Sequence, residues 1–279
     1  MKYLGVGVGL RRQHFDDVLQ LDHQVDFFEL LSENFMNYGG HPRKVITSLR
    51  NKKIPMIAHG VGLSLGSTDE LDSEYVKSLK ELLEFTEAPW FSDHLSFASE
   101  NKIHFHDLIP VLRTDEAVRF ISDKIKKIQD IFQRPFAIEN VSYYAESNHH
   151  TMNETDFINK LVNITDCNIL LDVNNVFVNS SNHLFDAKQY IDAIPMNKVI
   201  QLHIAGHFDR GDIILDTHGN FITDSVWDLY RYTVKAARRK ISSLIEWDND
   251  IPNFRTLESE AIKAKNIMSE VLSEVSGGL

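Results

Sequence analysis

The sequence alternates eight times between a short apolar run and a longer stretch with helical spacing. Several of the apolar runs are continuous, and continuous runs are typical of strands that are covered on both faces. They lie at residues 3–8, 27–31, 54–58, 90–91, 136–138, 169–171, 199–202 and 244–245. The helical stretches lie at 13–21, 42–49, 73–85, 114–131, 153–162, 186–194, 224–237 and 256–271. Eight strand–helix units in one chain predict a (β/α)8 TIM barrel.

The length of the chain favours a single domain. Its 279 residues contain no linker rich in Pro, Gly or Ser, so we predict one barrel domain over residues 1–279. An open doubly wound sheet is the alternative, but it would usually need fewer units and a phosphate-binding loop. The Gly5-x-Gly7-x-Gly9 motif is not the dinucleotide-binding loop, because its third glycine falls one residue early. We interpret these glycines as close packing at the first strand.

The charge and the cysteine content exclude several classes of function. A formal net charge of −11 argues against a general nucleic-acid binder, which needs a basic surface to displace counterions. No apolar run approaches the ~18 residues of a membrane-spanning helix, and the amino terminus does not resemble a secretion signal. We therefore predict a cytoplasmic protein without a membrane segment. Cys167 is the single cysteine, so an internal disulfide is excluded, and we interpret it as a small core residue.

Polar side chains follow six consecutive apolar runs at the point where each predicted strand ends. The active sites of (β/α)8 enzymes lie at the carboxyl ends of the strands, where these side chains would meet. The third to eighth runs supply His59, Asp93 with His94, Glu139, Asp172 with Asn175, His203 and Glu246. The loop after the seventh run adds Asp216 and His218, whose close spacing lets both side chains face one point.

Each of these residues has an ordinary structural explanation when it is taken alone. A strand-terminal Asp or Asn often caps the next helix, and a single histidine is often a hydrogen-bonded core residue. Asp216 and His218 also fit a polar turn with Gly219. Several ionisable groups packed near one axis are different, because each unpaired buried charge costs several kcal/mol. A multivalent cation removes that cost, so the pattern predicts a metal site.

The ligand types narrow the choice of metal. Histidine, carboxylate and amide ligands without thiolate point to iron, manganese or catalytic zinc. Because there are more candidate ligands than one ion can use, we predict three groups, in which a carboxylate such as Glu139 bridges two ions. The groups are His59, His94 and Glu139; Glu139, Asp172, His203 and Glu246; and Asn175, Asp216 and His218.

Two further residues are predicted to act from behind the ligands. His207 and Asp93 would orient the ligands or move protons. The fourth apolar run is followed by a long predicted loop that contains His104 and His106. This loop could line the mouth of the barrel, although ordinary exposure to solvent explains its two histidines equally well.

Nine blocks of the sequence resemble one known family. They are Gly7-Val8-Gly9-Leu10-Arg11, Phe28-Glu29 with Ser32-Glu33-Asn34, His59-Gly60-Val61-Gly62-Leu63-Ser64-Leu65-Gly66, Ser92-Asp93-His94-Leu95, Glu139-Asn140-Val141-Ser142, Leu171-Asp172-Val173-Asn174-Asn175, His203-Ile204-Ala205-Gly206-His207, Asp216-Thr217-His218-Gly219 and Glu246-Trp247-Asp248. From the first strand to the eighth, these blocks are similar to the DUF692 (UPF0276) family. Members of that family are described as multinuclear non-haem iron-dependent oxidative enzymes.

The resemblance implies a fold, a cofactor and a class of substrate. The family's barrel resembles the xylose-isomerase type, with two or three iron ions at its mouth and O2 as the cosubstrate. Characterised members act on cysteine residues of ribosomally made precursor peptides, either forming oxazolone and thioamide groups or excising the β-carbon. They often need a small partner protein that presents the peptide.

The predicted ligands match the family's His, Glu, Asp and Asn positions. They are His59, His94, Glu139, Asp172, Asn175, His203, Asp216, His218 and Glu246. Trp247 departs from the pattern, since the resemblance leads us to expect an arginine after the glutamate. We expect this change to alter substrate contacts without abolishing ligation.

Two other functions are compatible with the residues. A zinc- or manganese-dependent isomerase or phosphodiester hydrolase would use the same barrel and the same ligands. A non-catalytic metal-binding protein would use the ligands alone. Metal content dominated by zinc, with activity that survives without oxygen, would favour the first; loss of metal without loss of activity in His203→Ala would favour the second.

Overall fold

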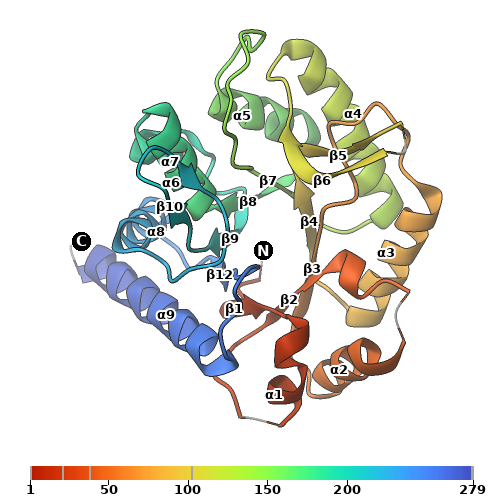
Figure 1. Ribbon diagram of the computed structural model, residues 1–279, viewed down its shortest axis with the longest axis vertical. Helices are drawn as coiled ribbons and strands as arrows, with labels where there is room; N and C mark the ends of the chain where they lie inside the picture. Colours follow the sequence, from red (N-terminus) through yellow and green to blue (C-terminus); the bar gives the residue numbers. More distant parts are fainter. Residues whose placement is uncertain (1, 21, 38, 102, 278–279) are drawn as a thin grey trace.

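A computed structural model describes residues 2–20, 22–37, 39–101 and 103–277. Within these residues, eight parallel strands close into a barrel in the order β1-β12-β9-β8-β7-β4-β3-β2 (Figure 1). Their bounds are Val6–Gly9 (β1), Phe28–Leu31 (β2), Met56–Gly60 (β3), Phe91–His94 (β4), Phe136–Glu139 (β7), Asn168–Asp172 (β8), Val199–Ile204 (β9) and Ser242–Ile245 (β12). The predicted (β/α)8 barrel is confirmed. The domain limits 1–279 stay a prediction, since both end residues lie outside the described residues.

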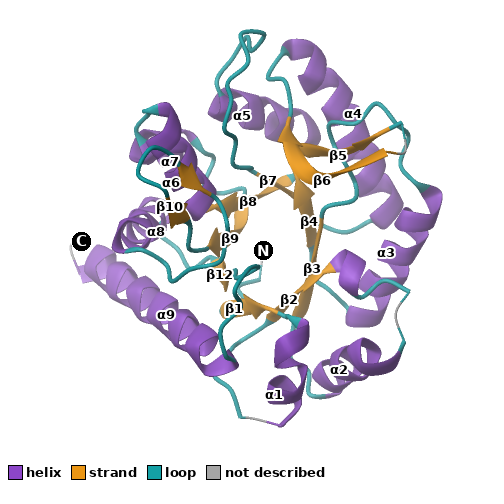
Figure 2. Ribbon diagram, in the orientation of Figure 1, coloured by secondary structure: helices purple, strands orange, loops and turns teal. Residues whose placement is uncertain are grey.

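Helices surround the barrel on the outside (Figure 2). Their bounds are Phe15–Gln20 (α1), Gly40–Asn51 (α2), Ser73–Thr86 (α3), Asp115–Phe132 (α4), Glu154–Thr165 (α5), Val173–His183 (α6), Ala187–Ala193 (α7), Asp224–Ala237 (α8) and Phe254–Gly277 (α9). Side-chain caps explain where several of them begin. The Asp72 carboxylate accepts hydrogen bonds from the backbone N–H groups of Glu74 and Tyr75, and Asn153 caps α5 in the same way.

The core has two parts on opposite sides of the strands. The larger part lies between the strands and the surrounding helices. The smaller part fills the inside of the barrel and consists of Phe27, Ile57, Trp90, Ala137, Leu170, Ile200 and Leu244. We call these seven residues the plug. All seven are buried, so the barrel interior is a packed core below the mouth rather than a channel.

The first strand is glycine-rich because the interior is crowded there. A Cβ atom at Gly7 would lie 2.6 Å from the ring of Phe27, a plug residue. A Cβ atom at Gly9 would lie 2.8 Å from the guanidinium of Arg11. The interpretation as a close-packing position is therefore confirmed for Gly7. The neighbour of Gly9 is the end of a flexible side chain, and Gly5 has a φ of +106°, a backbone conformation that also favours glycine.

Three connections differ from the sequence prediction. The long loop expected after the fourth strand is in part an antiparallel hairpin of β5 (Ser96–Glu100) and β6 (Ile103–Pro110). The segment after Asp172 forms the helix α6, which the periodicity did not indicate. A second small hairpin joins β10 (Phe208–Asp209) to β11 (Ile214–Leu215). The first predicted helix ends at Leu21, which lies outside the described residues.

No helix among the described residues has both the length and the apolar character that a membrane crossing requires.

Candidate metal centre

A two-residue offset relates the plug to the polar side chains at the mouth of the barrel. Side chains at i and i+2 of a strand point to the same face, one layer apart. On five strands, a plug residue is followed two positions later by a buried His, Asp or Glu. The pairs are Phe27 with Glu29, Ile57 with His59, Ala137 with Glu139, Leu170 with Asp172, and Leu244 with Glu246. The inward-facing residues of these strands therefore form an apolar layer and, directly above it towards the mouth, a polar layer.

The strand register aligns these polar residues around the ring. His94 is the register partner of Glu139, and Asp172 is the register partner of His203. Glu246 follows β12 directly, and its backbone N–H donates to the carbonyl of Ile204 on β9. Neighbouring strands thus present ligand-type side chains at one height.

Glu139 lies at the centre of the group. Its Oε2 atom is 3.0 Å from His59 Nε2 and 3.2 Å from His94 Nε2. Its Oε1 atom is 3.3 Å from His203 Nδ1. Each carboxylate oxygen therefore faces a different set of partners, which is the arrangement that a bridging carboxylate needs.

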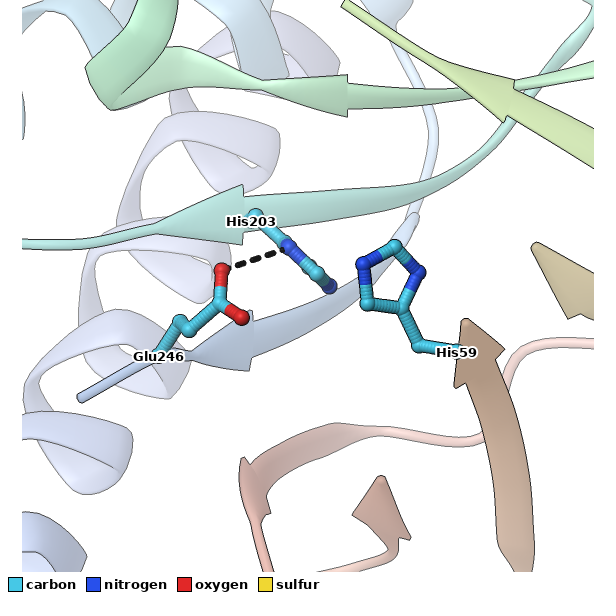
Figure 3. A group of neighbouring side chains, drawn as sticks. All are labelled: His59, His203 and Glu246. Carbon is cyan, nitrogen blue, oxygen red and sulfur yellow. Dashed lines mark ion pairs between the residues drawn. The ribbon is translucent and has the colours of Figure 1, made fainter. Parts of the chain in front are cut away.

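His203 connects the second group of predicted ligands. Its Nδ1 atom is 2.9 Å from Glu246 Oε2 and 4.0 Å from Asp172 Oδ2. Figure 3 shows His59, His203 and Glu246 pointing towards one another from different strands. The ligand atoms of Glu139, Asp172, His203 and Glu246 all lie within 4.8 Å of one another, and so do those of His59, His94 and Glu139. Each of these groups could hold a metal ion.

The loop between β11 and α8 brings Asp216 and His218 to the same place. The two side chains are in contact, with 2.8 Å between Asp216 Oδ1 and His218 Nε2. The other ring nitrogen of His218 lies 3.3 Å from Glu246 Oε2 and 3.4 Å from Asp248 Oδ2. Asp248 was not among the predicted ligands, yet His218, Glu246 and Asp248 form a further group that could hold an ion. The loop residues therefore adjoin the second group.

Asn175 lines the mouth beside these groups. Its backbone N–H donates to Asp172 Oδ1 at 2.7 Å, which caps α6. Its side-chain Nδ2 donates to the carbonyl of Asn140 at 3.0 Å. The second bond orients the side-chain amide, whose Oδ1 atom has no hydrogen-bond donor in the protein.

Unpaired buried atoms show that the residues present fit a bound cation. Among the described residues, five predicted ligands each have a buried polar atom that makes no hydrogen bond, although four of these atoms lie within 4.0 Å of a side chain of opposite charge type. The atoms are Glu139 Oε2, Asp172 Oδ2, Asn175 Oδ1, His203 Nδ1 and His218 Nε2. Leaving a buried polar group unpaired costs about 1–3 kcal/mol each. The concentration of such atoms at one place fits a bound cation, which would take them as ligands.

Neighbouring carboxylates raise the pKa values of two histidines in the cluster, His59 and His203. Burial acts to lower the pKa of His59, but the charges of Glu139 and Glu29 outweigh it and raise this pKa to about 9. Burial likewise opposes protonation of His203, but Glu29, Glu246 and Glu139 hold its pKa well above the usual value. Without a metal, protons on these rings balance part of the carboxylate charge. Metal ions would replace those protons.

Asp93 and His207, the two predicted supporting residues, lie behind the ligands. The Asp93 carboxylate accepts hydrogen bonds from the backbone N–H groups of Leu63 at 3.0 Å and His94 at 2.8 Å. Burial and then the charge of Glu33 raise its pKa to about 7. Asp93 therefore fixes the backbone that carries His94.

His207 is linked to the predicted ligand Asp216 by hydrogen bonds through the side chain of Asn174. Its Nδ1 atom is 2.9 Å from Asn174 Oδ1, and Asn174 Nδ2 donates to Asp216 Oδ1 at 2.8 Å. Because the Asn174 amide uses its N–H on Asp216, its oxygen accepts, and His207 Nδ1 carries the hydrogen. The ring also stacks on Phe177 with 5.0 Å between centroids. His207 is thus held in one orientation, linked to a predicted ligand.

Sequence reasoning gave no role to two charged residues of the site, the buried Glu29 and the partly exposed Arg11. Glu29 follows the plug residue Phe27 by two positions, so the offset that marks four of the predicted ligands would have found it. Arg11 donates from Nε to the Trp247 carbonyl at 3.2 Å, lies 3.7 Å from Glu246 Oε1 and also contacts Asp248. Glu29 lies on β2, whereas Arg11 lies in the segment just after β1. A guanidinium therefore stands beside Glu246 although residue 247 is a tryptophan.

A large cavity opens above the cluster. Its volume is about 1220 Å³, and its floor includes His59, His94, Glu139, His218 and Glu246. Its walls come from the segment after β1, from residues 107–110 of β6 and from Tyr143 and Tyr144 after β7. Pockets for small molecules usually measure ~300–1,000 Å³. This cavity is larger, so it can admit part of a chain molecule.

Comparison with protein families gives a match over almost the whole chain. Residues 5–269 match the model of the family described as RiPP precursor modification enzyme MbnB/TglH/ChrH. RiPPs are ribosomally synthesised and post-translationally modified peptides. The chain belongs to this family, which is the DUF692 (UPF0276) family that the sequence blocks indicated. The predicted membership is confirmed.

Curated relatives within the DUF692 family align along almost their full length. A UPF0276 protein of Anaeromyxobacter sp. (strain Fw109-5) is 41% identical over 277 residues, which cover 99% of this chain and 97% of the relative. A UPF0276 protein of Shewanella loihica is 39% identical and covers 96% of this chain and 95% of its own. The match is therefore not confined to the metal-site motifs.

Solved structures show what the barrel of this DUF692 protein resembles. A xylose isomerase domain-containing protein from Salmonella typhimurium has a TM-score of 0.59 at 12% identity, covering 98% of this chain and 99% of its own. An L-ribulose 3-epimerase has a TM-score of 0.59 at 10% identity, covering 98% and 96%. At such low identity the likeness concerns the fold alone, and it confirms the xylose-isomerase-like barrel.

Proposed function

We propose that this protein is an iron-dependent oxidative enzyme that uses O2 to modify cysteine residues of a ribosomally made precursor peptide. The observation that carries the proposal is a set of five buried ligand-type atoms without a hydrogen-bond partner, three of which belong to residues that line a cavity of about 1220 Å³, namely Glu139, Asn175 and His218. Membership in a family of RiPP precursor modification enzymes supplies the class of substrate.

Each predicted ligand has a place in this proposal. His59, His94 and Glu139 would hold one ion, and Glu139, Asp172, His203 and Glu246 would hold a second. A third ion would use Asn175, Asp216 and His218. Bound iron would supply the redox chemistry and the acidity that turns a coordinated cysteine thiol into a thiolate.

The protein's own residues would position ligands and substrate. His207 holds Asn174, which holds Asp216, so the loop ligand keeps its orientation while the cavity fills. Asp93 keeps the His94 backbone in place. Tyr143 and Tyr144 line the wall above the cluster, where an extended peptide would contact their rings. We also propose that a small partner protein presents the peptide to this mouth.

The test uses ferrous protein reconstituted without oxygen and the cysteine-bearing peptides encoded beside the gene. Adding air should shift the mass of one of these peptides, with or without a neighbouring small protein. The same peptide with serine in place of cysteine should not change, and neither should the native peptide with Glu139→Gln. This substitution nearly preserves shape but removes the charge between His59 and His203.

Two outcomes would contradict the proposal. Iron-loaded protein that changes no neighbouring peptide, with any neighbouring partner, would remove the assigned substrate class. Metal content dominated by zinc or manganese, together with activity that survives without oxygen, would favour the isomerase or hydrolase alternative.

A further inference from the structure

We infer that Glu29 is a positioning residue that sets the tautomer of His203, keeping the proton on Nε2 so that Nδ1 faces the metal. The inference rests on the metal-binding part of the proposed function. It concerns a residue on β2, which lies across the barrel from the strand that carries His203 (Figure 1).

The two nitrogens of the His203 ring face different surroundings. Nε2 lies 3.0 Å from Glu29 Oε2. Nδ1 lies 2.9 Å from Glu246 Oε2 and 3.3 Å from Glu139 Oε1, within the cluster. A neutral imidazole has one N–H and one lone pair, so a carboxylate at Nε2 favours the hydrogen there and leaves the lone pair of Nδ1 for a cation.

Glu29 is itself held by two buried side chains. Gln201 Nε2 donates to Glu29 Oε2 at 2.5 Å, and Trp90 Nε1 donates to Gln201 Oε1 at 2.8 Å. An indole nitrogen can only donate, so Trp90 decides which end of the Gln201 amide is oxygen. The amide N–H must then face Glu29. The chain Trp90, Gln201, Glu29, His203 therefore has one consistent direction of donation.

The same geometry contains a competing tautomer. Gln201 Nε2 also lies 3.0 Å from His203 Nε2, so it could donate there and force the hydrogen onto Nδ1. That arrangement would point an N–H at the cation, and it would leave the Glu29 charge without its histidine donor. The Glu29 charge decides between the two arrangements, because it pairs with a proton on Nε2.

Energetics argue against a purely structural purpose for this chain. Gln201 is completely buried and Glu29 is 2% exposed, directly above the apolar plug. Replacing a buried ion pair with apolar residues of similar size is often neutral or stabilising, by about 1–4 kcal/mol. In metal sites, a buried carboxylate commonly accepts a hydrogen bond from the second ring nitrogen of a metal-ligating histidine and so orients the ring.

The experiment compares Glu29→Gln with Glu33→Gln. Glu33 also lies near the mouth and accepts hydrogen bonds from the Val61 N–H and the Tyr75 hydroxyl, but it is not bonded to His203. Metal-free proteins are titrated with Co2+ alone against a competing chelator. We expect the affinity of one site to fall about 10–100-fold in Glu29→Gln and to stay unchanged in Glu33→Gln.

A second measurement reports the tautomer directly. Long-range nitrogen–proton NMR spectra of the Zn2+-loaded wild type should show His203 with its hydrogen on Nε2, in the signal that disappears in His203→Gln. Gln201→Leu removes the hydrogen bond that orients Glu29 while keeping the charge, so it should weaken Co2+ binding less than Glu29→Gln. It also keeps the question testable if Glu29→Gln does not fold.

The outcomes separate this inference from the proposed function. Equal Co2+ affinity in Glu29→Gln and the wild type, or a hydrogen on Nδ1 of His203, overturns the role of Glu29 alone. A wild type that binds no Co2+ overturns both the role and the metal-dependent function.

Discussion

The two layers inside the barrel are built on the same strands and differ in almost every property. The plug consists of apolar side chains that need no partner beyond one another. The upper layer consists of His59 and four carboxylates two residues later on the same strands, together with the histidines that contact these carboxylates. Glu139, Asp172 and His203 in this layer each have a buried atom without a hydrogen-bond partner. The plug stabilises the fold by burial, whereas burying the charges of the upper layer costs stability, a cost that a bound cation would offset. Residues that stabilise the fold and residues of the candidate metal centre thus lie only two positions apart on the same strands.

The largest effect that sharpens this contrast is removal of the metal. An ion at a thousand times its dissociation constant stabilises a protein by about 4 kcal/mol. Loss of two ions should therefore lower the melting temperature by more than about 10 °C, since 1 kcal/mol shifts it by about 2–4 °C in a chain of this size. Calorimetry before and after chelation measures this. An unchanged melting temperature would mean that no bound metal ion contributes to stability and that the charges of the upper layer are balanced by the protein alone.

The next effect concerns the plug. Phe27→Ala should lower the free energy of unfolding by about 3–5 kcal/mol, because it leaves a cavity in a fully buried position. The number of metal ions bound per folded chain should not change. Phe221→Ala, at a position that is 62% exposed, makes the same chemical change and should cost much less. A plug variant that lost metal while still folded would break the separation of the two layers.

A smaller effect distinguishes parts of the upper layer. His218→Ala should remove one ion, because the ring contacts the loop ligand Asp216 and the edge of the cluster. His203→Ala should disturb two ions, because its Nδ1 atom faces both Glu139 and Glu246. Metal analysis of the two purified variants measures this. Equal metal counts in the two would contradict the division into separate groups.

The smallest effect is a pH dependence of the metal-free protein. Burial raises the pKa of Asp172 from 3.8 to about 7, against the opposing charge of His218. The unfolded chain therefore ionises this carboxyl first, so its contribution to stability falls as pH rises from about 4 to about 7. Metal-free Asp172→Asn should gain roughly 2–4 kcal/mol on the metal-free wild type across that window. Urea unfolding of both metal-free proteins at pH 4.5 and pH 8 measures their free energies of unfolding. If the advantage of Asp172→Asn over the wild type became smaller as the pH rose, the cost of burying the ionised carboxyl would be contradicted.

The sequence was a good guide to the barrel because its strands are short, apolar and regularly spaced. All eight predicted runs overlap a strand of the barrel. The hairpin of β5 and β6 was missed because its polar residues, including His104, look like those of a loop. Helix α6 was missed because its start, with Asn174 and Asn175, is rich in residues that are common in turns.

The candidate ligands and the supporting residues Asp93 and His207 could be proposed from the sequence, whereas no role could be proposed for Glu29 or Arg11. Glu29 lies one strand before the run of six ends that drew attention, and its role depends on a contact with His203 across the barrel. Arg11 approaches Glu246 from the other end of the chain, which no local spacing reveals. Contacts of this kind depend on barrel closure, so they become visible only when the strands are placed in space.

The two-residue offset also limits which changes of sequence this chain can accept. Substituting a residue of the upper layer alters one side chain and leaves the packing below it in place. Inserting or deleting a single residue within a strand would turn its plug residue and its ligand outward together, because neighbouring residues face opposite sides. Evolution along these strands can therefore proceed by replacement far more readily than by a change of length.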